Sequence, residues 1–306
     1  MANRLRVTEL DFDSIKQNLK NFLNQQSEFT DYDFEGSGLS VLLDLLAYNT
    51  HYQAYYLNMI ANESFLDTAL LRDSVISHAK VLGYVPYSRK APQANINFTV
   101  SSTTDTPATV TIPKGFRFLS NEIDGISYGF VTLGETIVTK SNTSFNFLNL
   151  PIHEGQLVTY SYTHNQATNP KQVFSVPDDG VDTSTITISV QVSSSNTASE
   201  IYTLATEASE ATTTSPVFYL QENKDQRFDI YFGNNVIGKS IPDGAVVSMT
   251  YLITNGSSAN KANNFVATGT LADSLGNGLS NFTIDPVGEA AGGAERESVD
   301  EIKFSA

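Results

Sequence analysis

The chain has 306 residues and 40% of them are hydrophobic, which excludes wholesale disorder and leaves room for two or three domains. Its formal net charge is −15 and its 18 Lys and Arg residues are scattered, which argues against a nucleic-acid backbone as a partner. The absence of Cys excludes disulfides, thiolate metal sites and Cys nucleophiles, and is compatible with assembly in a reducing cytosol.

The first 37 residues contain one predicted helix. The start, MANRLRVTELDFDSIKQ, has no apolar core of a signal peptide, and no stretch of the chain is apolar over about 18 residues, as a membrane span requires. Asp11 or Asp13 can cap a helix that ends near Gln26 and carries one apolar stripe. That stripe consists of Ile15, Leu19, Phe22 and Leu23.

Residues 38–60, GLSVLLDLLAYNTHYQAYYLNMI, form the most apolar predicted helix, and Ser37 can cap it. Six side chains follow the 3, 4, 3, 4, 3 spacing of a heptad seam: Leu42, Leu45, Asn49, Tyr52, Tyr56 and Met59. Asn49 at such a position is typical of bundles in which a buried amide fixes the register. The pattern fits either the core helix of one domain or a helix bundled with other chains.

Aromatic residues favour the second interpretation of this helix. Tyr48, Tyr52, Tyr55 and Tyr56 lie within nine residues, and four tyrosines spread around a helix cannot all face one small core. Tyrosine buries a large area and keeps a polar contact, which suits interfaces. The predicted partner interface is therefore the heptad set together with Tyr55.

The region after residue 60 is expected to stay helical until a stop signal at Gly83 and Pro86, with Asp73 or Ser74 capping the last helix. The hydrophobic period then changes from 3.6 to 2. Strands are predicted at residues 95–100, 109–112, 116–119, 128–131, 135–138, 182–193, 217–220, 228–232 and 246–253. The polar stretches SSSNTASE and ATEASEATTTS are predicted surface loops.

The predicted fold class is α+β, with an N-terminal bundle-forming helical region followed by mostly antiparallel β domains. The expected divisions are a helical assembly region at 1–88, a first β domain at 89–160 and a second at 161–285. Residues 286–306 are expected to begin a further region, with a helix around Glu295 to Lys303 that would be marginal alone.

One stretch imitates a nucleotide site. Residues 233–240, GNNVIGKS, fit the phosphate-loop pattern and follow a predicted strand. The pattern requires Gly-Lys-Ser to open a helix, and Pro242 excludes one here. We therefore predict a turn in a β-hairpin.

No other constellation predicts catalysis or a cofactor. His51, His78, His153 and His164 lack metal-ligand spacing, and no nucleophile elbow is present. The Asp and Glu residues are dispersed. We expect no enzyme activity, no catalytic residues, no metal, no cofactor and no small-molecule substrate.

Several motifs together resemble a known family. Residues 31–52, DYDFEGSGLSVLLDLLAYNTHY, followed by ESFLDTALLRDSV and LGYVP, resemble the N-terminal region of inner baseplate wedge subunits of contractile-tailed myovirus phages, within the wider baseplate-J-like family. TIPKGFRF, FDIYFGNNVIGKSIPDGAVVSMTYLITNG and GGAERES follow in the same order. The resemblance covers nearly the whole chain.

The resemblance implies a structural role in the tail baseplate of a virion assembled in the host cytoplasm. Two copies would bundle their N-terminal helices with a smaller wedge partner, and six wedges would form a ring around the tail hub. Tail hub and sheath proteins would be indirect partners, and neither nucleic acid nor membrane is expected. Family members continue past the motif at GGAERES, so the chain is expected to lack their ring-joining region. The alternative function is a receptor- or glycan-binding tail component that uses the loops between Ser193 and Ser215.

Overall fold

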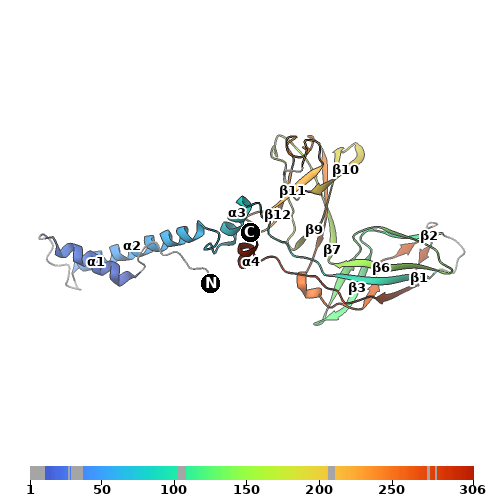
Figure 1. Ribbon diagram of the computed structural model, residues 1–306, viewed down its shortest axis with the longest axis horizontal. Coiled ribbons are helices and arrows are strands. Elements are labelled where there is room, and N and C mark those ends of the chain that lie inside the picture. The colour runs from blue at the N-terminus through green and yellow to red at the C-terminus, as the bar shows by residue number, and fades with distance from the viewer. Residues whose placement is uncertain are drawn as a thin grey trace. The chain divides into compact units, whose positions relative to one another are not determined.

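The computed structural model describes residues 11–26, 28, 37–101, 108–205, 211–273, 276–279 and 281–306. The chain divides into two compact units. The helical unit comprises Met1–Val85 with Ser298–Ala306, and the β unit comprises Pro86–Glu297 (Figure 1). Helices come first and mostly antiparallel strands follow, which confirms the predicted α+β class and the change of period near residue 88.

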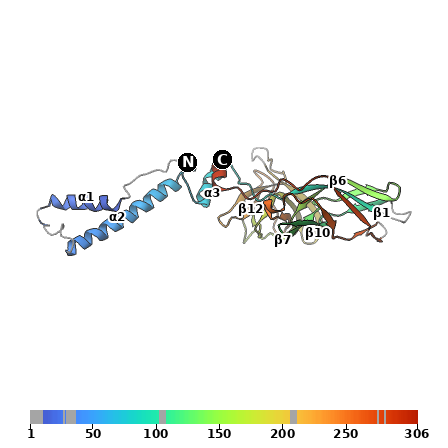
Figure 2. The ribbon, with the colours of Figure 1, turned by 90° about the horizontal axis from the view of Figure 1, so that it is seen from below.

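In the helical unit, α1 (Phe12–Asn24) lies beside α2 (Gly38–Glu63), as Figures 1 and 2 show. The Asp11 carboxylate accepts the Ser14 amide at 3.1 Å, and the Ser37 hydroxyl accepts the Ser40 amide at 3.0 Å. Both predicted caps therefore form. Because α1 has 13 residues and α2 has 26, α1 can cover only part of the longer helix.

The other two helices, α3 (Arg72–Val81) and α4 (Val299–Ser305), share a small core of Ala69, Val75, Ala79 and Ile302. Gly83 ends α3 with φ +80°, as predicted. The predicted cap of α3 is wrong, because the helix begins at Arg72 and its N-cap Leu71 makes no side-chain bond. The helix does not continue unbroken from residue 60 either: α2 ends at Glu63, whose carboxylate accepts the Leu70 amide at 2.8 Å.

All predicted strands form, and several that were not predicted form as well. The sequence SSSNTASE is not a simple loop: Asn196–Leu204 is β10, which pairs with β9 (Val181–Ser193). Within SSSNTASE the described side chains of β10, those of Asn196, Ala198, Ser199 and Glu200, are polar or small and exposed, so this part of the strand carries no hydrophobic alternation. The buried Tyr202 lies beyond it. The other unpredicted strands are β6 (Ser144–Glu154), β7 (Gln156–Thr163), β8 (Val173–Ser175), β14 (Phe265–Ala267), β15 (Leu271–Ala272), β16 (Gly278–Leu279) and β17 (Phe282–Pro286).

One sheet of the β unit has the strand order β14-β3-β4-β6-β1-β17. Here β1 is Gln93–Ser101, β3 is Arg117–Ile123 and β4 is Ile126–Val131. A separate ribbon pairs β2 (Thr109–Ile112) with β5 (Thr136–Thr139). Buried aromatic rings fill this part, and the Phe98 centroid lies 5.7 Å from that of Phe118 and 5.2 Å from that of Phe282.

The other sheet has the order β7-β13-β9-β10-β11-β12-β8, with β11 at Val217–Glu222, β12 at Phe228–Phe232 and β13 at Val246–Ile253. Ile188, Ile230, Met249 and Tyr251 are fully buried in its core. The pairing differs from the expected division of the chain, because β14 and β17 return to the first sheet after the second is complete. Antiparallel sheets can include strands from distant parts of the sequence, so sequence position alone does not reveal which sheet β14 and β17 join.

A buried polar joint connects the two sheets within the β unit. The Glu154 carboxylate, at the end of β6, accepts the Thr254 hydroxyl at 2.6 Å and the Asn255 backbone and side-chain amides at 3.1 and 2.7 Å. Asp182 accepts the Ala91 amide at 2.8 Å. Since buried carboxylates need such donors, these bonds fix how the sheets meet.

His153 beside this joint gives a testable pH dependence. Burial lowers the pKa of its imidazole, and the nearby Asp182 carboxylate offsets part of that shift. Because the pKa of His153 is lower in the folded chain, the unfolded chain binds more protons than the folded chain once the pH falls below about 6.5. Lower pH therefore favours unfolding. We expect the melting temperature to fall between pH 7 and pH 5, and to fall less in His153→Gln. Calorimetry at matched ionic strength measures both slopes; equal slopes would contradict this assignment.

Candidate functional site

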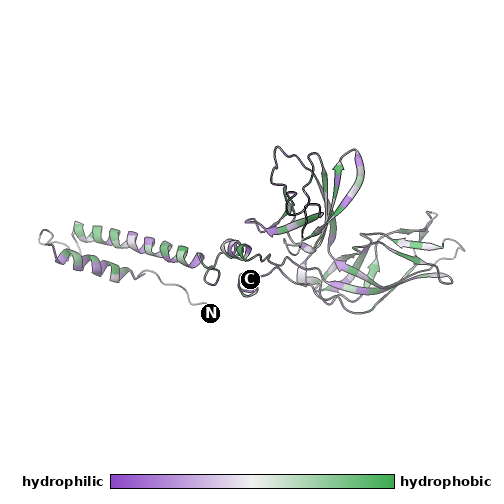
Figure 3. Ribbon diagram, turned by 45° about the horizontal axis from the view of Figure 1, so that its top comes forward, coloured by the Kyte–Doolittle hydropathy of each residue, from purple (hydrophilic) through white to green (hydrophobic). Residues whose placement is uncertain are grey.

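The largest group of exposed apolar side chains in the described residues lies on α2, where green segments run along the helix in Figure 3. Large hydrophobic residues at eleven of its positions are 40–63% exposed. They are Val41, Leu42, Leu45, Leu46, Tyr48, Tyr52, Tyr55, Tyr56, Leu57, Met59 and Ile60. We call this set the α2 surface. Contiguous exposed apolar surface of this kind marks interaction sites on soluble proteins.

A different face of α2 is buried. It consists of Ser40, Leu43, Ala47, Ala54 and Asn58, and the Asn58 side-chain amide donates to the Ala54 carbonyl at 2.9 Å. Lys16 of α1 forms an ion pair with Asp44 of α2 at 2.5 Å, which links the two helices. The small residues permit close approach, and the larger residues of α2 are left to face outward.

Charge is nearly absent from the α2 surface. Asp44 and Glu63 are the acidic residues of α2, and it contains no Lys or Arg. Asp44 pairs with Lys16, and Glu63 accepts amides that follow the helix. A solvated helix face normally carries charged residues, so the composition of this surface favours burial against other helices.

The tyrosines of the α2 surface contact one another. The Tyr48 hydroxyl donates to that of Tyr52 at 3.0 Å, and their ring centroids are 4.6 Å apart. The Tyr55 and Tyr56 rings are 5.9 Å apart in an edge-on arrangement. Such mutually supported rings lose little conformational freedom on binding, which suits a contact surface.

All seven residues predicted for the partner interface are exposed on α2: Leu42, Leu45, Asn49, Tyr52, Tyr55, Tyr56 and Met59. Their role as an interface stays a prediction. Val41, Leu57 and Ile60 were not predicted, because they fall outside the heptad seam. Their apolar type on an otherwise uncharged helix was the available signal.

The phosphate-loop imitation has a different structure. No helix follows Ser240, as predicted, but the predicted hairpin is wrong because β12 and β13 do not pair with each other. The glycines serve packing: a Cβ on Gly233 would lie 2.1 Å from the carbonyl carbon of Gly238. Periodicity located both strands but could not give their order in the sheet.

We predict that this loop does not bind nucleotide, because its amides are already donated. Those of Gly238 and Lys239 bond to the carbonyls of Thr212 and Ser215, and that of Ser240 bonds to the Asn235 side chain. Lys239 itself pairs with Glu200 at 2.6 Å. Calorimetry with ATP and Mg²⁺ should show no binding heat at micromolar concentration. Binding that disappears in Lys239→Ala would contradict this prediction.

The described residues lack two features. They contain no group of three or more His, Cys, Asp or Glu side chains placed to hold a metal ion. Among them, no helix combines the length and apolar character needed to cross a bilayer.

The helical region matches a known protein family. Residues 11–84 match a family described as "Baseplate wedge protein gp6-like, helical domain". The baseplate wedge protein gp6 of Enterobacteria phage T4 is 33% identical over 312 residues. That alignment covers 95% of this chain and 46% of the relative, so the chain spans about half the length of the phage T4 protein.

A solved structure is also similar in part. A chain of the anti-feeding prophage baseplate, a sixfold-symmetrised cryo-EM structure, aligns with 99% of this chain and 60% of its own length. The TM-score is 0.33 and the sequence identity 12%. Both sequence matches are to baseplate wedge proteins, in agreement with the resemblance noted from the motifs. Membership of the wider baseplate-J-like family stays an expectation.

Proposed function

We propose that this chain is a structural subunit of the baseplate wedge of a contractile phage tail. The observation that carries the proposal is the uncharged α2 surface, which lies within the range that matches the gp6-like helical domain. The 33% identity to a phage T4 wedge protein supports the same role. In this role the chain is part of the tail baseplate of the virion, which is assembled in the host cytoplasm.

In this proposal α2 is an assembly element. It packs against helices of a second copy and of another wedge protein, and so covers Tyr52, Tyr56 and Met59. Hub and sheath proteins are reached only indirectly, through the completed ring. The β unit serves as a stiff arm, because the joint around Glu154 fixes its two sheets.

A structural role without catalysis is part of the proposal. The backbone amides of residues 238–240, in the stretch that imitates a phosphate loop, already donate hydrogen bonds within the chain. The phage T4 relative is named as a baseplate wedge protein. The glycan-binding alternative would use residues 193–215, which include the polar β10 hairpin. No cluster of aromatic and polar side chains in the described part of that stretch favours it.

Co-expression with the other tail proteins encoded beside this gene tests the proposal. A tagged chain should purify in a complex that contains two copies of itself and a helical partner, with the mass measured by light scattering. A chain that stays monomeric and alone in that co-expression, while remaining folded, would contradict the proposed function.

A further inference from the structure

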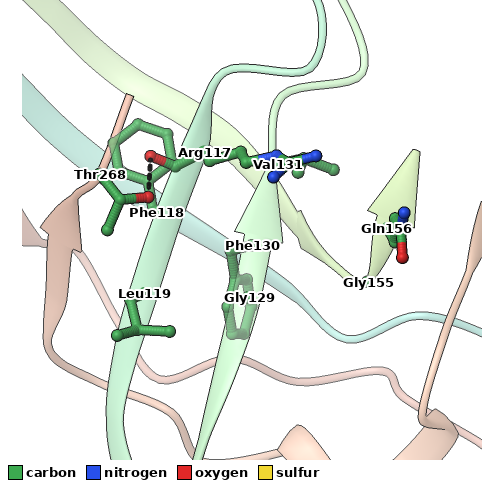
Figure 4. Close-up of a pocket in the computed structure, with 9 residues that line it drawn as sticks. All are labelled: Arg117, Phe118, Leu119, Gly129, Phe130, Val131, Gly155, Gln156 and Thr268. Atoms are coloured by element: carbon green, nitrogen blue, oxygen red, sulfur yellow. Dashed lines mark hydrogen bonds between the residues drawn. The ribbon is translucent and has the colours of Figure 1, made fainter. Parts of the chain in front are cut away.

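The β unit carries a second feature of interest, a recess of about 350 Å³ that Figure 4 shows in close-up. It is lined by residues of β3, of β4 and of the turn that leads into β7. The lining includes the side chains of Arg117, Leu119 and Gln156 and the backbone of Gly129 and Gly155. Ligand pockets in proteins begin at about 300 Å³, so the recess is large enough to take one bulky group.

The alternation of β3 decides which of its side chains border the recess. Phe118 is buried in the aromatic core, so Arg117 and Leu119 on either side of it belong to the opposite, exposed face of the strand. Two residues that are two positions apart in a strand are separated by about 7 Å and point the same way. A cation therefore borders the recess beside an apolar side chain, Leu119, which is 42% exposed.

Gly129 of β4 keeps the space beside Leu119 open, because the two residues are paired across the strands and glycine has no side chain. The fold would accept a larger residue here: φ is not positive, and no described atom lies within 4 Å of where a Cβ would be. Gly155 differs, since a Cβ there would lie 2.3 Å from the Ile253 carbonyl oxygen. A glycine inside a strand weakens it and often marks a place that a ligand or another chain approaches closely.

The polar side chains of the recess have donors to spare. Arg117 reaches across the end of β4 (Figure 4), and its guanidinium makes no ion pair or hydrogen bond with the described residues. Three other arginines of the β unit each bind a carboxylate or amide oxygen. The side-chain amide of Gln156 likewise has no hydrogen bond in the described part of the chain. An unpaired guanidinium in a chain of net charge −15 is complementary to a carboxylate from another molecule.

We propose that this recess binds the C-terminal residue of another polypeptide, with its carboxylate on Arg117 and its apolar side chain over Gly129, against Leu119. A guanidinium and a carboxylate form two parallel hydrogen bonds, and the Gln156 amide can donate a further one. Val266 of β14 is paired with Leu119, so it lies on the same face of the sheet, and it is 67% exposed. It therefore extends the apolar wall on which the bound side chain rests.

A chain end fits the recess better than an internal acidic residue. Consecutive side chains of an extended segment point to opposite sides, so an acidic residue and its apolar neighbour cannot both enter one recess. A C-terminal residue carries its carboxylate and its side chain on the same Cα, and so one residue reaches both Arg117 and Leu119. The inference concerns a surface of the β unit and does not depend on the proposed wedge function.

Calorimetry with short acetylated peptides tests the inference on the full chain. The peptide Gly-Ser-Gly-Ser-Leu with a free carboxylate should bind at submillimolar concentration. The same peptide with a C-terminal amide, and a free acid that ends in Gly instead of Leu, should each bind at least tenfold more weakly. Equal affinity of the Leu acid and its amide, or no binding of the Leu acid at millimolar concentration, would overturn the inference. Equally tight binding of an amidated peptide with an internal Glu-Leu pair would also overturn it, because the recess would then take an acidic side chain.

Two variants locate the site on the chain. Arg117→Gln should weaken binding of the Leu acid at least tenfold and remove its preference over the amide. Gly129→Val, which fills the space beside Leu119, should weaken the Leu acid by a similar factor and keep the melting temperature, since that space is open. The matched controls are Lys171→Gln, which removes an exposed charge outside the recess, and Gly134→Val, at an exposed glycine with open space. Both controls should bind like the unchanged chain; unchanged binding in Arg117→Gln or Gly129→Val would overturn the assignment.

Discussion

Replacing Tyr52 and Tyr56 together by Ala should weaken the association of the chain with its helical partners about a hundredfold. Both side chains are about half exposed on α2 in the single chain, at 42% and 55%, so a large part of each is available for burial. Aromatic residues at the centre of an interface each contribute on the order of 2 kcal/mol when truncated. Because the Tyr52 and Tyr56 ring centroids are 6.3 Å apart, the two losses are not additive, and a combined loss of about 3 kcal/mol corresponds to roughly a hundredfold change in the dissociation constant.

The measurement combines light scattering with thermal melting. The double variant should leave the melting temperature of the β unit unchanged, since the tyrosines are on the helical unit. Gln53→Ala is the matched control, because Gln53 is exposed on the same helix and is not apolar. If the double variant instead lowers the stability of the isolated chain and the stoichiometry stays the same, α2 is an internal core helix and the proposed bundle is wrong.

Hydrophobic periodicity predicted the strands of this fold better than it predicted which strands pair with each other. Residues 109–112, 228–232 and 246–253 were predicted with the bounds of β2, β12 and β13. Their sheet order depends on long-range pairing, which local periodicity does not contain. For that reason the hairpin expected at Gly233 was wrong, and the return of β17 to the first sheet was not foreseen.

The candidate site was partly predictable for a similar reason. A heptad pattern marks residues that repeat along one line of a helix, and it identified Tyr52 and Met59 among the exposed residues of α2. It could not show that α1 would cover small residues such as Ala47 and leave Ile60 outside. Strand β7 was also missed, although QLVTYSYT alternates Val158, Tyr160 and Tyr162 with Thr and Ser, which is a strand pattern, and β13 pairs with it along its full length.

The interpretation of the β unit as a stiff arm depends on Glu154. This side chain is 1% exposed and its carboxylate receives the Thr254 hydroxyl, the Asn255 backbone amide and the Asn255 side-chain amide. Glu154→Ala would leave the buried Thr254 hydroxyl without an acceptor, which costs about 1–3 kcal/mol. It would also remove two bonds that the exposed Asn255 makes to a charged acceptor, at about 1 kcal/mol each after water takes their place. We expect the β unit to lose about 3–5 kcal/mol of unfolding free energy, among the larger effects of single substitutions.

Melting of matched variants measures this loss. For a unit of this size, a loss of about 4 kcal/mol lowers the melting temperature by roughly 10 °C. Glu154→Gln should have a smaller effect, because the amide keeps one acceptor oxygen but places an NH₂ group where Asn255 already donates. Glu122→Ala removes an exposed carboxylate from β3 and should change stability by less than about 0.5 kcal/mol. If Glu154→Ala melts like Glu122→Ala, the bonds to Thr254 and Asn255 do not hold the two sheets together, and the stiffness of the arm must come from apolar packing around Leu252 instead.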